Sequence, residues 1–241
     1  MTERFTDRLR RDSEPAWSQA TGHRFVRALC DGSIDDAVMA GYLVQDHRFL
    51  DSFLALLGAA IATADTLPVR LRFGRSAGYV SGDENDYFLR AFAALGVSEA
   101  DRAAPADTAP TAGFSALMRE AADTRCYAAI LSVLCVAEWL YLDWAMAAPR
   151  PLPPRFEHAE WITLHDNADF RAFVAMLRSE LDRVGPAQEA TSRAFFLRAV
   201  SLEKAFLDAA SDPAGAREIV PAPGSARHPP GDSRPLDPSR S

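Results

Sequence analysis

The sequence predicts an all-α fold, with one large helical domain followed by a C-terminal segment of different composition. Along most of residues 1–210, apolar side chains recur at spacings of three and four, the period of a helix buried on one face. No run of alternating apolar and polar residues is long enough for a sheet. The chain has 241 residues, of which 48% are hydrophobic and 24% charged, so a single domain can bury a substantial core.

The first clearly periodic helix is predicted over residues 34–63. Ser33 stands before two aspartates, which predicts an N-cap followed by an acidic first turn. The pair Leu67-Pro68 should end this element, because the residue before a proline avoids helical backbone angles. Several predicted helices exceed 20 residues. The further predicted helices cover residues 83–95, 114–123, 126–148, 156–164, 168–184 and 186–210.

Glycines and prolines mark the boundaries of these later helices. Gly96 closes the helix before it, and Gly185 with Pro186 separates the last two helices. Residues 99–113 are rich in Ala, Pro, Asp and Thr and are predicted to form a loop. Four prolines between positions 149 and 154 form a stiff connector.

The composition excludes several classes of partner. The net charge is −7 and there is no basic cluster, so neither nucleic acid nor a membrane surface is an expected partner. The apolar run of residues 127–144 contains Glu138, which leaves about ten apolar residues before it, whereas a membrane span needs roughly 20. We therefore expect a buried core helix there. The N-terminus lacks an apolar signal core, so a cytoplasmic location is expected.

The C-terminal 31 residues differ from the rest of the chain. Seven of the 16 prolines lie in residues 211–241, where there is no aromatic residue. Such a segment cannot bury enough apolar area to offset the entropy lost on ordering. We predict a disordered tail, with a passive extension favoured over a protein-recognition role.

Asp46 is the first candidate for a functional carboxylate. It lies mid-helix, on a face that also carries Tyr42, Phe49 and Phe53. A carboxylate in such a stripe is costly to bury unless it is paired. Two interpretations stay open. Asp46 lies at the edge of the stripe and is solvated, or it accepts hydrogen bonds from the amine or amidine-like edge of a flat ligand on which Phe49 stacks.

Glu138 is the carboxylate that water should reach least easily, because apolar or small residues precede it and Trp139 follows it. A buried glutamate has a raised pKa, which suits acid–base chemistry, and Tyr141 shares its helix face. The alternative is a structural glutamate bonded to the backbone or an arginine of another helix. Glu203 on the last helix is more ambiguous, because Phe206 shares its face whereas the neighbouring Lys204 indicates a solvated face and a surface ion pair.

The histidines and cysteines give weaker signals. His165 ends a predicted helix and is more typical of a C-terminal cap or a packing residue than of a catalyst. His47 and His158 are expected to be exposed. Cys135 lies among apolar residues, where a thiol is inert, and no base stands at helical spacing from it. The three cysteines form no CxxC pair and are predicted to be free, buried thiols in a reducing compartment.

Three short motifs resemble the TenA/thiaminase II family. They are His23-Arg-Phe-Val, Asp31-Gly-Ser and Tyr42-Leu-Val-Gln-Asp46. The resemblance extends from about residue 5 to residue 208. It implies a helical bundle of the haem-oxygenase-like type and an enzyme that degrades or salvages thiamin-derived aminopyrimidines.

The resemblance also implies roles for individual residues. Asp46 falls on the aspartate that holds the amino group of the substrate. Leu202-Glu203-Lys-Ala-Phe206 is similar to the family's Tyr-Glu-x-x-Phe, so Glu203 falls on the catalytic acid–base glutamate and Phe206 on an aromatic wall of the pocket. The residues that stand where family members have a pocket tyrosine are Phe49, Phe114 and His165.

One departure from the family concerns the nucleophile. Thiaminase II members carry Leu-Pro-Cys-x-Trp-x-Tyr, and matching Trp139 and Tyr141 to that motif puts Ala137 at the cysteine position. Cys135 is two residues early, about 200° around the helix. Glu138 stands beside the vacant position. The chain is thus similar to the branch that uses glutamate in place of the active-site cysteine.

These residues imply an aminopyrimidine hydrolase of thiamin salvage. It would convert an amino- or formylaminomethyl-pyrimidine to hydroxymethyl-pyrimidine, with Glu203 and Glu138 as catalytic carboxylates and with Phe49, Tyr141 and Phe206 around the ring. No cofactor and no metal are expected, and the resemblance implies a homo-oligomer. Two alternatives stay open. One is an oxidase on the same fold, cofactor-free or with a metal held by Glu84, Glu138, His165 and Glu203; the other is a non-catalytic pyrimidine-binding protein.

Overall fold

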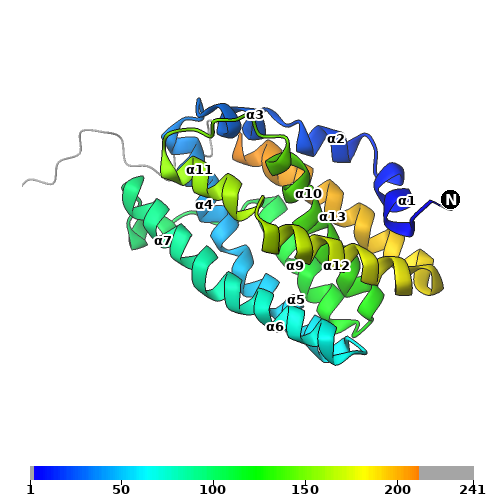
Figure 1. The fold of residues 1–241 in the computed structure, drawn as a ribbon. Helices are drawn as coiled ribbons and strands as arrows, with labels where there is room; N and C mark the ends of the chain where they lie inside the picture. Colours follow the sequence, from blue (N-terminus) through cyan, green and yellow to red (C-terminus); the bar gives the residue numbers. More distant parts are fainter. Residues whose placement is uncertain (1–2, 212–241) are drawn as a thin grey trace, which may run out of the picture.

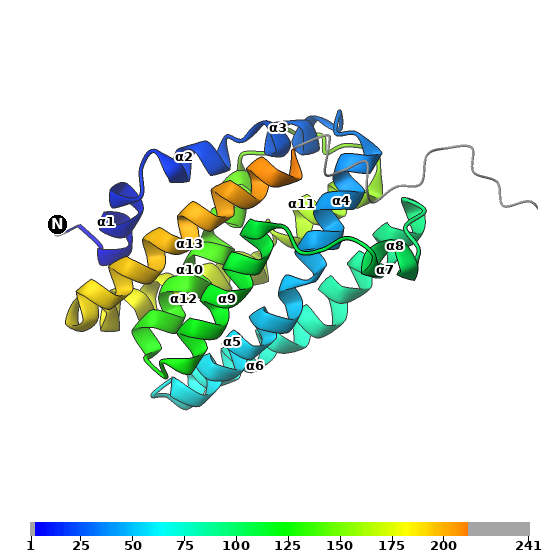
Figure 2. The ribbon, with the colours of Figure 1, turned by 180° about the vertical axis from the view of Figure 1, so that it is seen from behind.

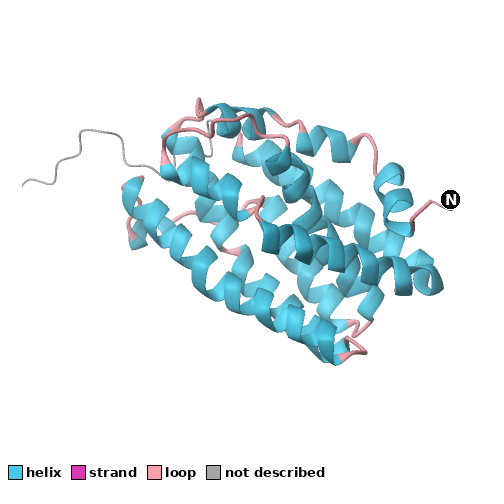
Figure 3. Cartoon of the chain, viewed as in Figure 1, coloured by secondary structure: helices cyan, strands magenta, loops and turns pink. Residues whose placement is uncertain are grey.

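The computed structural model describes residues 3–211, and within that range it consists of helices joined by short turns, with no strand (Figure 3). The all-α prediction is therefore confirmed. The buried hydrophobic residues form one cluster that extends from Phe5 to Leu207. Apart from Ser211, which caps the last helix, the predicted tail of residues 211–241 lies outside the described residues.

The helices follow one another closely along the chain. Two of the fifteen elements are not α-helical: η1 is a π-helical turn and η2 a 3₁₀ turn. In order, the elements are α1 (Phe5–Asp12), α2 (Ala16–Thr21), α3 (Arg24–Asp31), α4 (Asp36–His47), α5 (Phe49–Thr63), α6 (Leu67–Tyr79), η1 (Val80–Glu84), α7 (Asn85–Ala94), α8 (Glu99–Ala103), α9 (Ala109–Asp123), α10 (Tyr127–Met146), α11 (Phe156–Leu164), α12 (Ala168–Val184), η2 (Gly185–Gln188) and α13 (Glu189–Ala210).

The central element is α10, which packs against α5, α9, α12 and α13 (Figures 1 and 2). The short helices α1 and α2 lie along α13 on one side of this bundle. On another side α6 packs along α5 and continues through η1 into α7, so that residues 67–94 form one long helical rod. Ala128 to Val136 are all buried, as a helix surrounded by other helices requires.

By length and hydropathy α10 could also cross a membrane, but 83% of its most apolar 18-residue window is buried inside the protein. It is the core helix that the sequence predicts. The helices predicted over residues 156–164 and 168–184 are also present with those bounds. Gly185 follows α12 where the ring of Phe5 approaches closely, and an added Cβ would come within 2.3 Å of Phe5 Cε1. The residue that separates the last two helices therefore also has a packing reason to be glycine.

The prediction of one helix over residues 34–63 is wrong, because the segment forms two helices, α4 and α5, and the first begins at Asp36. It breaks at Arg48, whose guanidinium donates to the carbonyl oxygens of Arg102 and Pro105 and thereby ties the break to the end of α8 and the residues that follow it. The N-cap is Asp35, whose carboxylate accepts the Ala37 N–H, and not Ser33. The break at Arg48 divides the longest predicted helix and α10 has 20 residues, so only α13, with 22, exceeds 20 in the described chain, against the several long helices expected.

Two further segments differ from the prediction. Leu67-Pro68 begins α6 and does not simply end the element before it, since a proline in the first turn of a helix loses no hydrogen bond. The predicted loop of residues 99–113 contains α8 and the start of α9. Both starts have a side-chain cap, in which Ser98 accepts from the Asp101 N–H and Thr108 accepts from the Thr111 N–H.

Candidate active site

A small cavity lies where α4, α5, η1, α9, α10, α11 and α13 meet, with a volume of about 70 Å³. Four carboxyl groups line it, each from a different element: Asp46, Glu84, Glu138 and Glu203. We call this space the inner cavity. Seven of the eight residues predicted for the site line it, namely Asp46, Phe49, Phe114, Glu138, Tyr141, His165 and Glu203.

Asp46 is buried, with 8% of its surface exposed, so the interpretation that it is solvated is wrong. Burial raises the pKa of its carboxyl well above the ordinary value, and the charge of Glu84 adds to the effect. The hydroxyl of Tyr141 approaches Asp46 Oδ1 at 3.5 Å, which is long for such a bond. Most of the hydrogen-bonding capacity of this carboxyl therefore remains available to a ligand.

Tyr141 is itself held by a buried chain of donors. Trp161 Nε1 donates to the Tyr42 hydroxyl at 3.2 Å, and the Tyr42 and Tyr141 hydroxyls are 3.0 Å apart. Because the Trp161 N–H can only donate, the protons can all point one way, from Trp161 through Tyr42 and Tyr141 to Asp46. This chain fixes the orientation of Tyr141 and favours an acceptor at Asp46.

Glu138 and Glu203 are also buried, and in the described part of the chain neither forms a hydrogen bond or an ion pair. The structural role of Glu138 and the surface ion pair of Glu203 that the sequence left open are therefore wrong. Burial raises the pKa of both carboxyls well above the usual value. For Glu203 the nearby charges of Asp46 and Glu138 raise the pKa further. Two carboxyl groups that favour their neutral forms thus share one cavity, an arrangement suited to proton transfer.

Glu84 is the one carboxyl group of the cavity that the sequence analysis did not assign to the hydrolase site. It ends η1, a π-helical turn inserted between α6 and α7, and such turns are frequent at functional sites. Burial raises the pKa of Glu84 to about 7, so this carboxyl can gain or lose a proton near neutral pH. The neighbours of Glu84 in the sequence are polar, and its carboxyl group reaches the cavity from the π-helical turn.

The Glu84→Gln variant should change how stability depends on pH. A carboxyl with a folded-state pKa of about 7 and an ordinary pKa of 4.5 contributes stability that is fully present below pH 4.5 and is lost as the pH rises through 7. The amide does not titrate. We expect the melting temperature of the variant, relative to the wild type, to rise between pH 4.5 and pH 8 in thermal denaturation followed by circular dichroism.

Asp86→Asn is the matched control, because the Asp86 side chain is exposed on the next turn. Its melting temperature relative to the wild type should stay constant over the same range. A constant difference for Glu84→Gln as well would mean that Glu84 is solvated and does not belong to the cavity.

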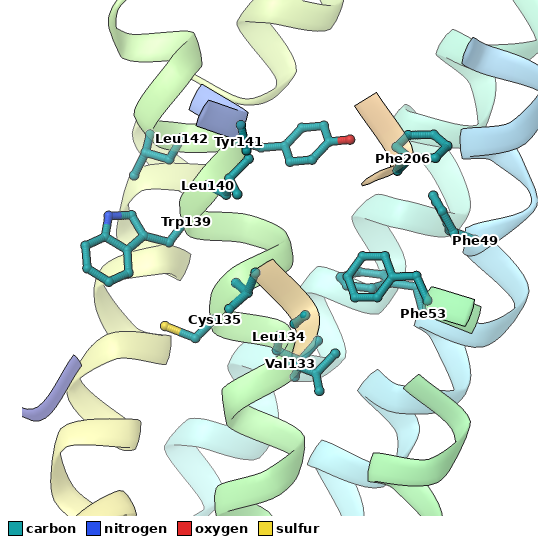
Figure 4. Packing of buried hydrophobic residues seen from close by; sticks show 14 of the residues in the cluster. Phe49, Phe53, Val133, Leu134, Cys135, Trp139, Leu140, Tyr141, Leu142 and Phe206 are labelled. Atoms are coloured by element: carbon teal, nitrogen blue, oxygen red, sulfur yellow. The ribbon is translucent and has the colours of Figure 1, made fainter. Parts of the chain in front are cut away.

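Aromatic side chains form the walls around the carboxyl groups. Phe49 meets Phe114 and Phe206 edge to face, with ring centroids 5.5 and 4.9 Å apart. Phe206 does not line the inner cavity but lies behind Phe49, and Figure 4 shows Tyr141 pointing toward both. The described walls therefore offer the face or edge of several rings to a flat ligand.

His165 closes α11 and lines the cavity as a neutral ring. Its Nδ1 lies 2.9 Å from the Trp161 carbonyl oxygen, which can only accept, so Nδ1 carries the proton and Nε2 is left as an acceptor. Burial lowers the pKa of His165 to about 4. His47 and His158 were expected to be exposed, and this prediction is wrong. His158 is only 1% exposed, and the partly buried His47 ring packs on Phe88.

The cysteines lie away from the cavity. Cys135 points to the side of α10 opposite Tyr141 (Figure 4), and burial raises the pKa of its thiol to about 12. Ala137, at the position matched to the family cysteine, does line the cavity. Cys30 is buried as predicted, whereas Cys126 is only partly buried, and all three thiols are free. In residues 3–211 no group of three His, Cys, Asp or Glu side chains is arranged to hold a metal ion.

Comparison with known proteins finds relatives of the TenA type by sequence and by structure. A family model described as TENA/THI-4/PQQC matches residues 10–213. An aminopyrimidine aminohydrolase of Halalkalibacterium halodurans is 23% identical over 213 residues, covering 86% of this chain and 95% of that protein. A TenA homologue from P. horikoshii has a TM-score of 0.78 at 23% identity, covering 86% of this chain and 98% of the other. A domain with a haem oxygenase-like fold from Shewanella denitrificans has a TM-score of 0.63 at 16% identity, covering 85% and 91%. The haem-oxygenase-like fold expected from the sequence is confirmed.

Proposed function

The chain belongs to the TENA/THI-4/PQQC family, and from this membership and the inner cavity we propose that it is an aminopyrimidine hydrolase of thiamin salvage. It hydrolyses the bond between nitrogen and the methylene carbon of an amino- or formylaminomethyl-pyrimidine. The observation that carries the proposal is the meeting of four carboxyl groups in one aromatic-walled cavity that no thiol lines.

Asp46 binds the amino group on the pyrimidine ring. The support is its burial in the cavity and its single long contact with Tyr141, which leaves acceptor positions free. A carboxyl group can take one hydrogen bond from the amino group and share a proton with the adjacent ring nitrogen. The ring lies against Phe49 and Tyr141, with Phe114 and His165 at its rim and Phe206 supporting Phe49 from behind.

Glu203 and Glu138 carry the proton transfers. The charge of one carboxylate disfavours ionisation of the other, so the pair holds one proton: the protonated carboxyl gives it to the departing nitrogen, and the ionised partner takes a proton from the water that attacks the methylene carbon. One C–N bond breaks and one C–O bond forms, so aminomethyl-pyrimidine and water give hydroxymethyl-pyrimidine and ammonia. Glu84, with its pKa near 7, exchanges protons with this pair from the side that faces outward.

Cys135 takes no part in this chemistry. We expect Cys135→Ser to keep turnover of the aminopyrimidine within a few-fold of the wild type, because the thiol is buried away from the cavity. The same variant should lose some stability, on the order of 1–3 kcal/mol, since a hydroxyl replaces a thiol in an apolar site. A steady-state assay and a denaturant titration separate the two effects. A loss of turnover above about a hundredfold, roughly 2.7 kcal/mol of barrier, with the fold intact would contradict the proposed site.

The experiment that tests the proposed function is incubation of the purified protein with three compounds and chromatographic detection of the products. Aminomethyl-pyrimidine and formylaminomethyl-pyrimidine should yield hydroxymethyl-pyrimidine, whereas thiamin should be turned over far more slowly. Binding of the pyrimidines without any product would favour the non-catalytic binder. Preferential cleavage of thiamin would mean that the absence of the family cysteine does not determine which substrate the enzyme cleaves.

Two further expectations remain proposals. The first is a homo-oligomer. It is supported by large apolar side chains that are exposed on the helical rod of residues 67–94, namely Leu67, Leu71 and Leu89. Light scattering on the purified protein would measure it. The second is a cytoplasmic location, which the three free thiols favour, since reduced cysteines persist in a reducing compartment.

A further inference from the structure

A second, larger cavity adjoins the first. Its volume is about 380 Å³, whereas that of the inner cavity is about 70 Å³. The two share Glu84 and Glu138 as lining residues, so these carboxyl groups stand between them. We call the larger space the outer cavity. The remaining residues that line it come from α6, η1 and the start of α12: Arg72, Arg75, Ser76, Tyr79, Val80, Asn167, Asp169, Phe170 and Phe173.

The outer cavity has a basic side. Arg72, Arg75, Ser76 and Tyr79 follow the helical spacing of three, four and seven, so all four lie on one face of α6. Among the arginines of residues 3–211, only Arg72, Arg75 and Arg125 form no ion pair, side-chain hydrogen bond or aromatic contact. Two of these three line the same cavity. Most other arginines of the described chain are paired with carboxylates, so this pair is available to an anion from outside.

The facing side of the cavity adds to the positive potential. The first turn of α12, a helix of 17 residues, contributes Asn167, Asp169 and Phe170. The N-terminus of a helix carries a partial positive charge and unpaired N–H groups. Asp169 is exposed and, apart from Glu84 and Glu138, is the one acidic side chain that lines the outer cavity. Away from these two glutamates, the lining therefore combines two arginines and a helix N-terminus with a single carboxylate.

Apolar side chains also line the outer cavity. Phe170 of α12 packs against His165 of the inner cavity, with ring centroids 5.2 Å apart, and Phe173 packs against Phe73, the neighbour of Arg72, at 6.1 Å. Val80 of η1 completes this apolar lining. An aliphatic chain can cross such a surface without leaving polar groups unpaired. The space thus joins a reaction centre at one end to an anion-binding end at the other.

We propose that the outer cavity binds the anionic end of a chain carried on the departing nitrogen of the substrate, with Arg72 and Arg75 holding a carboxylate or phosphate-type group. This inference rests on the proposed function and narrows its substrate class. The ring occupies the inner cavity, the cleaved bond lies beside Glu138, and the chain continues past Phe170 to the arginines. Hydrolysis then balances as before. The bond between the methylene carbon and the secondary amine nitrogen breaks, and water adds to give the hydroxymethyl-pyrimidine and the chain as a free primary amine.

The test uses binding, so that it does not depend on turnover. One probe is a 4-aminopyrimidine whose 5-methylene carries a non-hydrolysable ether chain ending in a carboxylate, and its partner ends in the isosteric neutral amide. A third probe ends in a phosphonate, which separates a carboxylate source from a phosphate source. Titration calorimetry at low ionic strength gives Kd for each probe with the wild type, the Arg72→Gln/Arg75→Gln double variant and the Arg125→Gln control.

We expect the better of the two anionic probes to bind the wild type about tenfold more tightly than the amide, and we expect 0.5 M salt to reduce this preference, as screening of exposed charges requires. The double variant should lose the preference, while Arg125→Gln keeps it. Equal Kd values for the anionic and neutral probes, or a preference that survives in the double variant, would overturn the proposal. The aminomethyl-pyrimidine assay on the same preparations tests the proposed function separately from the outer cavity. Absence of product would reject the hydrolase, whereas turnover without an anion preference would reject only the outer anion site.

Discussion

Replacement of Glu203 by glutamine is expected to lower kcat for aminomethyl-pyrimidine by about 10²–10⁴-fold, the range supplied by a positioned acid–base group. The amide keeps the shape of the side chain but can neither give nor take the proton. KM should change little, because Glu203 meets the departing nitrogen and the water while Asp46 holds the ring. Steady-state kinetics that report kcat and KM separately would measure both effects.

The fold should survive this change. Glu203 has no hydrogen bond or ion pair among the described residues to lose, and burial already favours its neutral form. The melting temperature of Glu203→Gln should therefore equal or exceed that of the wild type near neutral pH. Glu120→Gln, which alters an exposed ion pair with Arg198 outside the cavity, serves as the control and should keep full turnover. Retention of most activity in Glu203→Gln would remove Glu203 from the mechanism.

Asp46→Asn should act mainly on binding. Asp46 shares a proton with the ring nitrogen, and such a charge-assisted hydrogen bond contributes about 1.5–3 kcal/mol; asparagine has no proton to share, so the variant should raise KM or Kd by roughly 10- to 100-fold. The asparagine side chain can still accept one hydrogen bond, which is why the loss is not complete. Calorimetric titration with aminomethyl-pyrimidine in the Glu203→Gln background would give Kd without turnover.

Asp51→Asn is the matched control, because Asp51 lies on the adjoining helix α5 and pairs with Arg119 at the surface. It should leave Kd unchanged. If Asp46→Asn bound the ring as tightly as the wild type and lowered only kcat, Asp46 would be a proton-transfer group, and the assignment of the two roles would have to be exchanged.

The sequence predicted the carboxyl groups that interrupt apolar patterns. Glu138 was identifiable because a single acid within ten apolar residues is costly to bury without a purpose, and the structure does bury it without a partner in the described chain. Asp46 was identifiable as an acid on an aromatic stripe, although spacing alone did not decide whether water reached it. In both cases the local pattern contained the information, since burial of a helix face follows from its own periodicity.

Glu84 and the arginines of the outer cavity could not be found in this way. Glu84 lies in the polar run Gly82-Asp83-Glu84-Asn85-Asp86, which is typical of a solvated turn, and only the π-helical insertion directs it inward. The whole of α6, with Arg72 and Arg75, was overlooked because Leu67-Pro68 was interpreted as an end. A proline signal is ambiguous, since the missing N–H suits the first turn of a helix as well as the residue after its end.

The measurement that tests the central claim most directly is a crystal structure of the Glu203→Gln variant with aminomethyl-pyrimidine bound. We predict that the ring lies in the inner cavity against Phe49 and Tyr141, with its amino nitrogen about 3 Å from the Asp46 carboxylate. The methylene carbon should lie between position 203 and Glu138. A ring bound elsewhere, or one whose methylene points away from both positions, would contradict the account.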